Sequence, residues 1–219
     1  MLDAATLRHR MVENQVARRG VRGERLLAAM REIPREAFVD PGFEEFAYDD
    51  APLPIGEAQT ISQPYIVALM IEAAEVGAGD RVLEVGAGSG YAAAVMARMA
   101  DRVCAIERHA TLGEAAKERL QRLRLLNIEL RIGDGTRGWP EAAPFDAIVV
   151  SAGGPSVPYA LKQQLKIGGR LIMPVGRGQP QRLLKITRES ATAYREEDLG
   201  AVAFVPLVGE EGWSEDGDI

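Results

Sequence analysis

The sequence predicts a single α/β domain, built on a doubly wound, mostly parallel sheet with N-terminal helices before it and late strands after it. From residue 81 onward, short apolar runs alternate regularly with stretches of helical spacing. The apolar runs are typical of strands buried on both faces, as in parallel sheets whose right-handed crossover helices cover them. The length of 219 residues fits one domain and needs no disulfide or structural metal.

Two helices are expected before this alternation. Residues 3–31 carry apolar positions at helical spacing among many charges, and Gly20 and Gly23 break the pattern. We therefore expect two surface helices. Six arginines lie between Arg8 and Arg25, and we interpret them as a solvated helical face.

A long irregular loop follows. Residues 47–64 have no periodicity, hold three prolines and a glycine, and exceed the roughly 12–15 residues usual for a loop without a function. We expect this loop to be functional, and a helix through residues 66–73 to follow it. The remaining elements are predicted, in order, as a strand at 81–85, a helix at 91–99, a strand at 103–106, a helix at 112–123, strands at 128–132 and 145–150, a helix at 159–165, and strands at 170–174, 182–186 and 201–205.

The domain is expected to divide into four parts. These are the N-terminal helices and long loop (1–64), a ligand-binding α/β core (65–176), C-terminal strands (177–209) and an acidic tail (210–219). Because the last ten residues carry five acids and two glycines, we expect the tail to be frayed.

The composition excludes several classes of function. Lysine and arginine total 26 against 32 acidic residues, which disfavours a nucleic-acid binder. Cys104 is the single cysteine, and His9 and His109 are the two histidines, so no metal site and no Ser-His-Asp triad are expected. The N-terminus lacks an apolar signal core, and no run is long enough to span a membrane. We expect a cytoplasmic protein.

Three acids lie where the core strands end. Glu84 ends the first strand, Glu107 directly follows the second, and Asp134 directly follows the third. Each could be a loop acid or a helix cap. Because ligands of open α/β sheets bind outside the carboxyl ends of the strands, their recurrence favours one shared cleft. Glu107 comes 21 residues after Gly86, close to the spacing at which an acid accepts both ribose hydroxyls.

A glycine loop, Gly86-Ala87-Gly88-Ser89-Gly90, joins the first strand to a helix and lets the backbone approach a ligand. Tyr91 stands where the dinucleotide fingerprint has its third small residue, and Glu84 would repel a pyrophosphate. A nucleoside without phosphates fits better. S-adenosylmethionine is such a nucleoside: it has a free diol, an amino group and a positive sulfur. Asp134 could accept a hydrogen bond from the exocyclic amine of its adenine. NAD is the competing ligand.

Ser62 lies in the long loop just before a helix. One interpretation is a plain N-cap, although Tyr65 stands where a capping box would have Glu or Gln. The other is an anion site, in which the helix start and the Ser62 hydroxyl bind a substrate carboxylate.

These segments together resemble the protein-L-isoaspartate O-methyltransferase family. The resemblance spans most of the chain, and the proline-rich loop ending in TISQPY is its most specific mark, whereas the glycine loop is shared with many methyltransferases. The matching segments are PREAFV at 34–39, AYDDAPLPIGEAQTISQPYIVA at 47–68, VLEVGAGSGY at 82–91, GDG at 133–135, GWPEAAPFDAI at 138–148, QLKIGGRLIMPVG at 164–176 and FVPL at 204–207.

The resemblance implies a Rossmann-like methyltransferase fold, the cofactor S-adenosylmethionine, and isoaspartyl-containing proteins and peptides as substrates. It implies that Ser62 is the active-site serine and that the methyl ester closes spontaneously to a succinimide, which hydrolyses partly to normal aspartate. The cofactor contacts that it implies are Ile61, Gln63, Pro64, Glu84, Gly86, Gly88, Ser89, Glu107, Asp134 and Gly135.

The sequence departs from the family at Thr136, where bacterial members often have Trp, and at residues 151–154, which bear on substrate fit. Because an isoaspartyl carboxylate is ionised at neutral pH, transfer needs no general base and no metal, and Ser62 would only position the carboxylate. Two rival interpretations stay open: a methyltransferase of the same fold acting on a small molecule or RNA, and a non-catalytic adenosyl-binding interaction protein. No nucleic-acid or membrane partner is expected, and a monomer is favoured.

Overall fold

The computed structural model describes residues 3–214. Its helices are α1 (Ala4–Met11), α2 (Glu24–Glu32), α3 (Pro64–Ala73), α4 (Tyr91–Ala97), α5 (Ala110–Arg122) and α6 (Tyr159–Gln163). Its strands are β1 (Leu53–Pro54), β2 (Thr60–Ile61), β3 (Arg81–Val85), β4 (Arg102–Glu107), β5 (Ile128–Ile132), β6 (Phe145–Val150), β7 (Leu165–Val175), β8 (Gln181–Arg188) and β9 (Tyr194–Val202). Short turns of π-helix (Val12–Val16) and 3₁₀-helix join them, the latter at Ala17–Arg19, Arg35–Phe38, Glu44–Phe46, Gly135–Arg137 and Pro140–Ala142.

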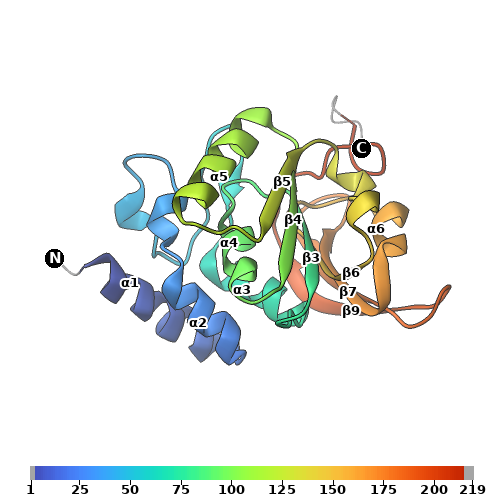
Figure 1. The fold of residues 1–219 in the computed structure, drawn as a ribbon, viewed down its shortest axis with the longest axis horizontal. Coiled ribbons are helices and arrows are strands. Elements are labelled where there is room, and N and C mark those ends of the chain that lie inside the picture. Colours follow the sequence, from blue (N-terminus) through green and yellow to red (C-terminus); the bar gives the residue numbers. More distant parts are fainter. Residues whose placement is uncertain (1–2, 215–219) are drawn as a thin grey trace.

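Seven of the described strands form one sheet in the order β5-β4-β3-β6-β7-β8-β9, and β1 pairs with β2 in a separate ribbon. The first five strands of the sheet run parallel, and β8 and β9 are antiparallel to their neighbours. Helices α3, α4 and α5 cover one face and α6 covers the other, with α1 and α2 outside α3 and α4 (Figure 1). The predicted doubly wound, mostly parallel fold is confirmed.

Alternation along β3 sends side chains to two separate cores. Val82 packs in the larger core, which joins the sheet to α2, α3 and α4, whereas Leu83 and Val85 pack in a second core under α6. Glu84 alternates with Leu83 and Val85, so it faces the side of the larger core, one residue before the strand ends. β3 therefore places a buried carboxylate near the carboxyl ends of the parallel strands.

The N-terminal helices break at Gly20 and Gly23, as predicted, and Gly20 has a positive φ of 104°. They lie at the surface, as predicted, and pack their apolar side on the larger core through Met11, Val12 and Leu26. Five of the six arginines are exposed, as predicted, although Arg22 lies outside the helices and Arg19 pairs with Asp50. Arg8 is instead half-buried, and its Nε donates to the Arg31 carbonyl over 2.7 Å.

Two predictions for the C-terminal third are wrong. The last strand, predicted at 201–205, is β9 at Tyr194–Val202, because a polar, largely exposed edge strand carries no apolar run to mark it. The chain is not frayed from residue 210 to residue 214. Glu210 N–H donates to Asp134, Trp213 Nε1 donates to the Gly153 carbonyl over 2.8 Å, and Glu211 accepts from the first amide of α6. The rest of the predicted tail lies outside the described residues.

Among the described residues, no helix combines the length and the apolar character that crossing a membrane requires.

Candidate functional site

The carboxyl ends of β3, β4 and β6 meet at the point where the strand order reverses. From β3 the chain winds outward to β4 and β5, then returns to β6 on the other side of β3. Such a switch point leaves a crevice between neighbouring strand ends, which is where ligands of open α/β sheets bind. Of the three predicted strand-end acids, the structure places Glu84 and Glu107 in the walls of this crevice.

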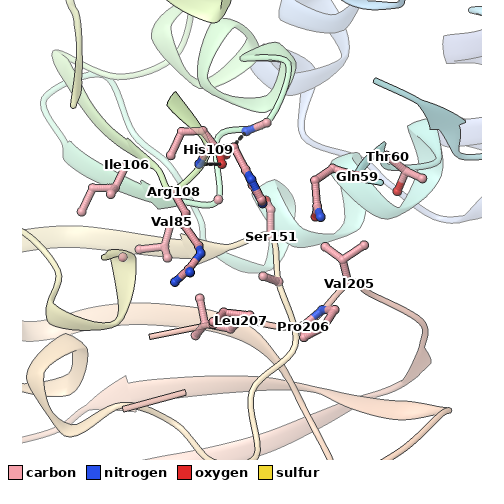
Figure 2. Close-up of a pocket in the computed structure, with 16 residues that line it drawn as sticks. Gln59, Thr60, Val85, Ile106, Arg108, His109, Ser151, Val205, Pro206 and Leu207 are labelled. Atoms are coloured by element: carbon pink, nitrogen blue, oxygen red, sulfur yellow. Dashed lines mark hydrogen bonds between the residues drawn. The ribbon is translucent and has the colours of Figure 1, made fainter. Parts of the chain in front are cut away.

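Three cavities of the described chain lie along the crevice, and Thr60 and Ser151 line all three. The glycine-loop cavity has about 330 Å³ and extends from Gly86 and Glu107 to Val205–Val208. In Figure 2, Gln59 and Thr60 lie on one side of it, Val205, Pro206 and Leu207 on another, and Ser151 between them.

The other two cavities continue the row. The junction cavity, of about 40 Å³, lies between Ser62 and Glu84 and beside the glycine loop. The proline-loop cavity, of about 620 Å³, extends from Ser62 to the residues around Phe204. Ser62 therefore lines both the small cavity and the large one, which suits a reaction between two ligands that bind on either side of it.

The glycine loop turns sharply above the end of β3. The N–H groups of Gly86 and Ala87 both donate to the Ile106 carbonyl, over 2.9 and 3.0 Å, which ties the loop to β4. Gly86 has a φ of 82° and Gly88 a φ of 52°, in the left-handed region that favours glycine. Gly88 also approaches Ile55 of the β1–β2 ribbon so closely that a β-carbon would lie 3.2 Å from it. The backbone rather than side chains therefore forms this wall.

Glu107 is held rigidly at the rim of the glycine-loop cavity. One carboxylate oxygen accepts from Gly88 N–H over 2.7 Å and the other accepts from His109 N–H over 2.9 Å. Each oxygen keeps a second lone pair that can accept from a ligand hydroxyl. The side chain is 4% exposed and lines the cavity, so its geometry suits recognition of a diol.

Glu84 is the most unusual acid of the site. It is 1% exposed and lines the junction cavity, and its Oε2 atom has no hydrogen-bond partner among the described residues. Burial, and then the nearby charge of Glu107, raise the pKa of Glu84 well above its ordinary value. A buried acceptor without a partner is costly in a folded protein. A positively charged amino group in the junction cavity would supply that partner.

Ser62 lies between β2 and α3 and is not the helix cap, so that interpretation is wrong. The N-cap of α3 is Gln63, whose side chain donates to the Asp50 carbonyl over 3.0 Å, and Pro64 is the first helical residue. Within the described chain the Ser62 hydroxyl makes no hydrogen bond, and Ser62 is partly exposed to the cavities. Its hydroxyl is therefore available to a ligand.

The other predicted cofactor residues divide into two groups. Ile61 and Ser89 line the junction cavity, Gln63 lines the proline-loop cavity, and Gly135 lines the glycine-loop cavity. A β-carbon at Gly135 would clash with Val85, so only glycine lets this turn approach β3. The second group, Pro64 and Asp134, lines none of the three cavities as the described residues define them.

The Asp134 carboxylate bonds to the chain itself. Its Oδ1 accepts from the N–H and the hydroxyl of Thr136, over 2.9 and 2.7 Å, and its Oδ2 accepts from Glu210 N–H over 2.9 Å. Burial opposes ionisation, but the hydrogen bonds from Glu210 and Thr136 outweigh it and lower the pKa of Asp134. The acid thus connects the turn after β5 to the C-terminal segment.

Several residues of the cavity walls were not predicted from the sequence. Thr60 and Ser151 line all three cavities, and Val205–Val208 closes one side of the glycine-loop cavity. Ser151 follows β6 just as Glu107 ends β4, so the strand-end rule would have found it if serine had been counted with the acids. The strand-end rule does not reach Val205–Val208, although FVPL at 204–207 was among the segments that resemble the family, because tertiary packing alone brings this segment to the site.

The sheet order and the ligand crevice at its switch point define a Rossmann-like α/β protein of the methyltransferase class. Residues 6–212 match the family model described as Protein-L-isoaspartate(D-aspartate) O-methyltransferase. The chain belongs to this family.

Relatives agree with this assignment. A protein-L-isoaspartate O-methyltransferase of Methylorubrum extorquens (strain PA1) is 61% identical over 206 residues, covering 94% of this chain and 90% of the relative. Protein-L-isoaspartate O-methyltransferase 1 of Rhodopseudomonas palustris (strain HaA2) is 57% identical over 211 residues, covering 96% and 86%.

Solved structures agree as well. A protein-L-isoaspartate O-methyltransferase superposes with a TM-score of 0.86 at 32% identity, covering 94% of this chain and 67% of that one. A Plasmodium falciparum chain assigned to the same activity, in complex with S-adenosyl-L-homocysteine, superposes with a TM-score of 0.80 at 27% identity, covering 92% and 98%.

Proposed function

We propose that the protein transfers a methyl group from S-adenosylmethionine to the free carboxylate of L-isoaspartyl residues in damaged proteins and peptides. The observation that carries this proposal is the free Ser62 hydroxyl between a small cavity that holds the unpartnered Glu84 carboxylate and a large cavity open to a peptide. Family membership supplies the activity, and this arrangement supplies a place for each reactant.

The residues of the row of cavities fit S-adenosylmethionine. When bound, the cofactor supplies a methyl group already activated by a positive sulfur. Glu84 would accept from its amino group, Glu107 would accept from its ribose hydroxyls, and the backbone of Gly86, Gly88 and Gly135 would line its path. The described residues around these cavities offer carboxylates and no phosphate cradle, which favours this ligand over NAD.

The substrate carboxylate is proposed to bind at Ser62. The hydroxyl donates to it, and the start of α3, whose first N–H groups lack helical acceptors, attracts its negative charge. Because that carboxylate is ionised at neutral pH, no side chain has to remove a proton. The chain contributes by aligning the two reactants, which can lower the activation barrier by up to about 7–11 kcal/mol. The methyl ester then leaves the site and closes to a succinimide without further help.

The experiment is methyl transfer from labelled S-adenosylmethionine to two matched peptides, one with isoaspartate and one with normal aspartate. We expect base-labile ester, scored as released methanol, on the isoaspartyl peptide alone. No label on either peptide, with binding of the cofactor confirmed by calorimetry, would contradict the substrate and leave a methyltransferase that acts on another molecule.

A further inference from the structure

Arg35 is a buried cation directly behind the proposed substrate site. It lies in the 3₁₀ turn Arg35–Phe38 and is 0% exposed. Its Nε donates to the Ala47 carbonyl and one terminal nitrogen donates to the Ser62 carbonyl, each over 2.8 Å. Ala47 and Ser62 lie near the two ends of the proline-rich loop. One side chain therefore ties both ends of this loop to the same point.

The charge of Arg35 is not neutralised by a direct ion pair. No carboxylate of the described residues lies within ion-pair distance of it, and the plane of Tyr91 faces its guanidinium with 4.9 Å between the Cζ atom and the ring centroid. The acid whose charge acts on Arg35 is Asp50, and Asp50 is already bonded to Arg19 over 2.8 Å. The cluster of Arg35, Asp50 and Arg19 therefore keeps one net positive charge.

Burying such a charge is unfavourable unless something compensates for it. Backbone carbonyls satisfy some of its donors but do not cancel the charge. Glu36, the next acid along the turn, faces Arg8 at 3.8 Å and accepts from the Tyr48 hydroxyl, so it is engaged elsewhere. An anion bound at the hydroxyl of Ser62, the residue whose carbonyl accepts from the guanidinium over 2.8 Å, would be the missing counter-charge.

We propose that Arg35 is a positioning residue for the substrate, which fixes the Ser62 main chain and attracts the isoaspartyl carboxylate through its buried positive charge. The proposal rests on the proposed function and adds to it a source of selectivity for a carboxylate over a neutral amide. The carboxylate loses its charge when it becomes an ester, so the attraction is strongest in the bound substrate. Arg35 should therefore act mainly on peptide KM rather than on kcat.

The test compares Arg35→Met, Arg35→Gln and Arg35→Lys with wild type. With S-adenosylhomocysteine bound to prevent turnover, the Kd is measured for an isoaspartyl peptide and for the matching peptide with a carboxamide in place of that carboxylate. We expect the two neutral variants to lower the preference for the carboxylate by about tenfold, because a unit charge is removed from a poorly solvated position. Arg35→Lys keeps the charge and should keep the preference within about threefold.

Arg170→Met is the matched control. Arg170 also donates to main-chain carbonyls, those of Ala74, Glu75 and Gly168, over 3.0, 2.7 and 3.2 Å. It lies level with the start of β3, at the opposite end of the strands from the crevice. The substitution should lower thermal stability without changing the carboxylate preference. A neutral Arg35 variant that binds S-adenosylhomocysteine normally and keeps the full preference would overturn the proposal.

Arg35→Lys decides the matter if the neutral variants do not fold. Lysine cannot bond both carbonyls in the fixed geometry of a guanidinium, so peptide KM should rise about fivefold while S-adenosylhomocysteine affinity stays constant. An unchanged KM would overturn the role of Arg35 in positioning Ser62. Absence of methyl transfer by wild type to the isoaspartyl peptide would instead count against the proposed function.

Discussion

Ser62 and Glu84 both present polar atoms to the junction cavity that the described chain does not satisfy. Their surroundings are otherwise well bonded, as the two amide contacts of Glu107 show. Most buried polar groups of native proteins have partners, so the exceptions indicate where a ligand supplies them. The Tyr91 hydroxyl, in the wall of the same cavity, also lacks a partner among the described residues.

Replacing Ser62 with alanine tests the first of these atoms. We expect kcat/KM for the isoaspartyl peptide to fall about ten- to a hundred-fold, the range for losing a hydrogen bond to a charged group. Cofactor affinity should change less than threefold, because Glu84 and Glu107 remain. Steady-state kinetics and calorimetry with S-adenosylhomocysteine provide the two measurements.

Ser190→Ala is the control for this substitution, since the Ser190 hydroxyl only accepts from amides of the β8–β9 turn, far from the site. It should leave both quantities unchanged. A Ser62→Ala protein that binds S-adenosylhomocysteine tenfold more weakly would show that the serine belongs to the cofactor site instead.

Between elements, Thr136 couples the turn after β5 to the C-terminal segment. Its hydroxyl donates to Asp134 over 2.7 Å and accepts from Glu211 N–H over 3.2 Å. Because Val205–Val208 lines the glycine-loop cavity, anything that loosens the residues after it also loosens that wall. This single threonine therefore links two segments that lie about a third of the chain apart.

Thr136→Val keeps the shape of the side chain and removes both hydrogen bonds. We expect faster deuterium exchange at the amides of Glu210 and Glu211, a loss of about 1–2 kcal/mol of stability, and weaker binding of S-adenosylhomocysteine. Thr187→Val is the control, because the buried Thr187 hydroxyl has no partner within the described residues and its removal should be neutral or stabilising. Unchanged exchange at Glu210 and Glu211 would refute the coupling.

For the whole molecule, Glu84 makes stability depend on pH. Burial first, and the charge of Glu107 second, raise the pKa of Glu84 in the folded protein above its ordinary value of 4.5. Between that ordinary value and the raised pKa, the folded protein holds a proton that the unfolded chain has released. The contribution of Glu84 to stability is therefore largest at low pH and is lost as the pH rises through the folded pKa. A cationic group bound beside Glu84 would favour its ionised form and so oppose this loss.

Without ligand, the Glu84→Gln variant should therefore have a higher melting temperature than wild type at pH 7–8. This difference between the two proteins should be smaller at pH 5. The substitution should also weaken S-adenosylhomocysteine binding at least about tenfold, because the buried partner of the amino group is gone. Differential scanning fluorimetry across pH and calorimetry measure the two effects. Glu118→Gln, at an exposed position on α5, should change neither. Parallel pH profiles for Glu84→Gln and wild type would contradict the assignment.

The parallel strands were predictable because each is a short apolar run bounded by turns, and β3, β5 and β6 have the predicted bounds. The strand-end rule then found Glu84 and Glu107, since parallel strands bring their carboxyl ends to one edge. Edge strand β9 was misplaced because its pattern is polar. The bonded C-terminal residues were missed because acidic composition says nothing of partners far away in the chain.

The sequence by itself determined the fold class, the glycine loop and the family, because periodicity, glycine spacing and a long specific loop are local properties of the chain. Only the tertiary structure decided which polar atoms stay free. It assigned the Asp134 carboxylate to the C-terminal segment, left the Ser62 hydroxyl and one Glu84 oxygen unbonded, and buried Arg35 behind the loop. Hydrogen bonds and charges depend on distances between segments far apart in sequence, and folding alone sets those distances.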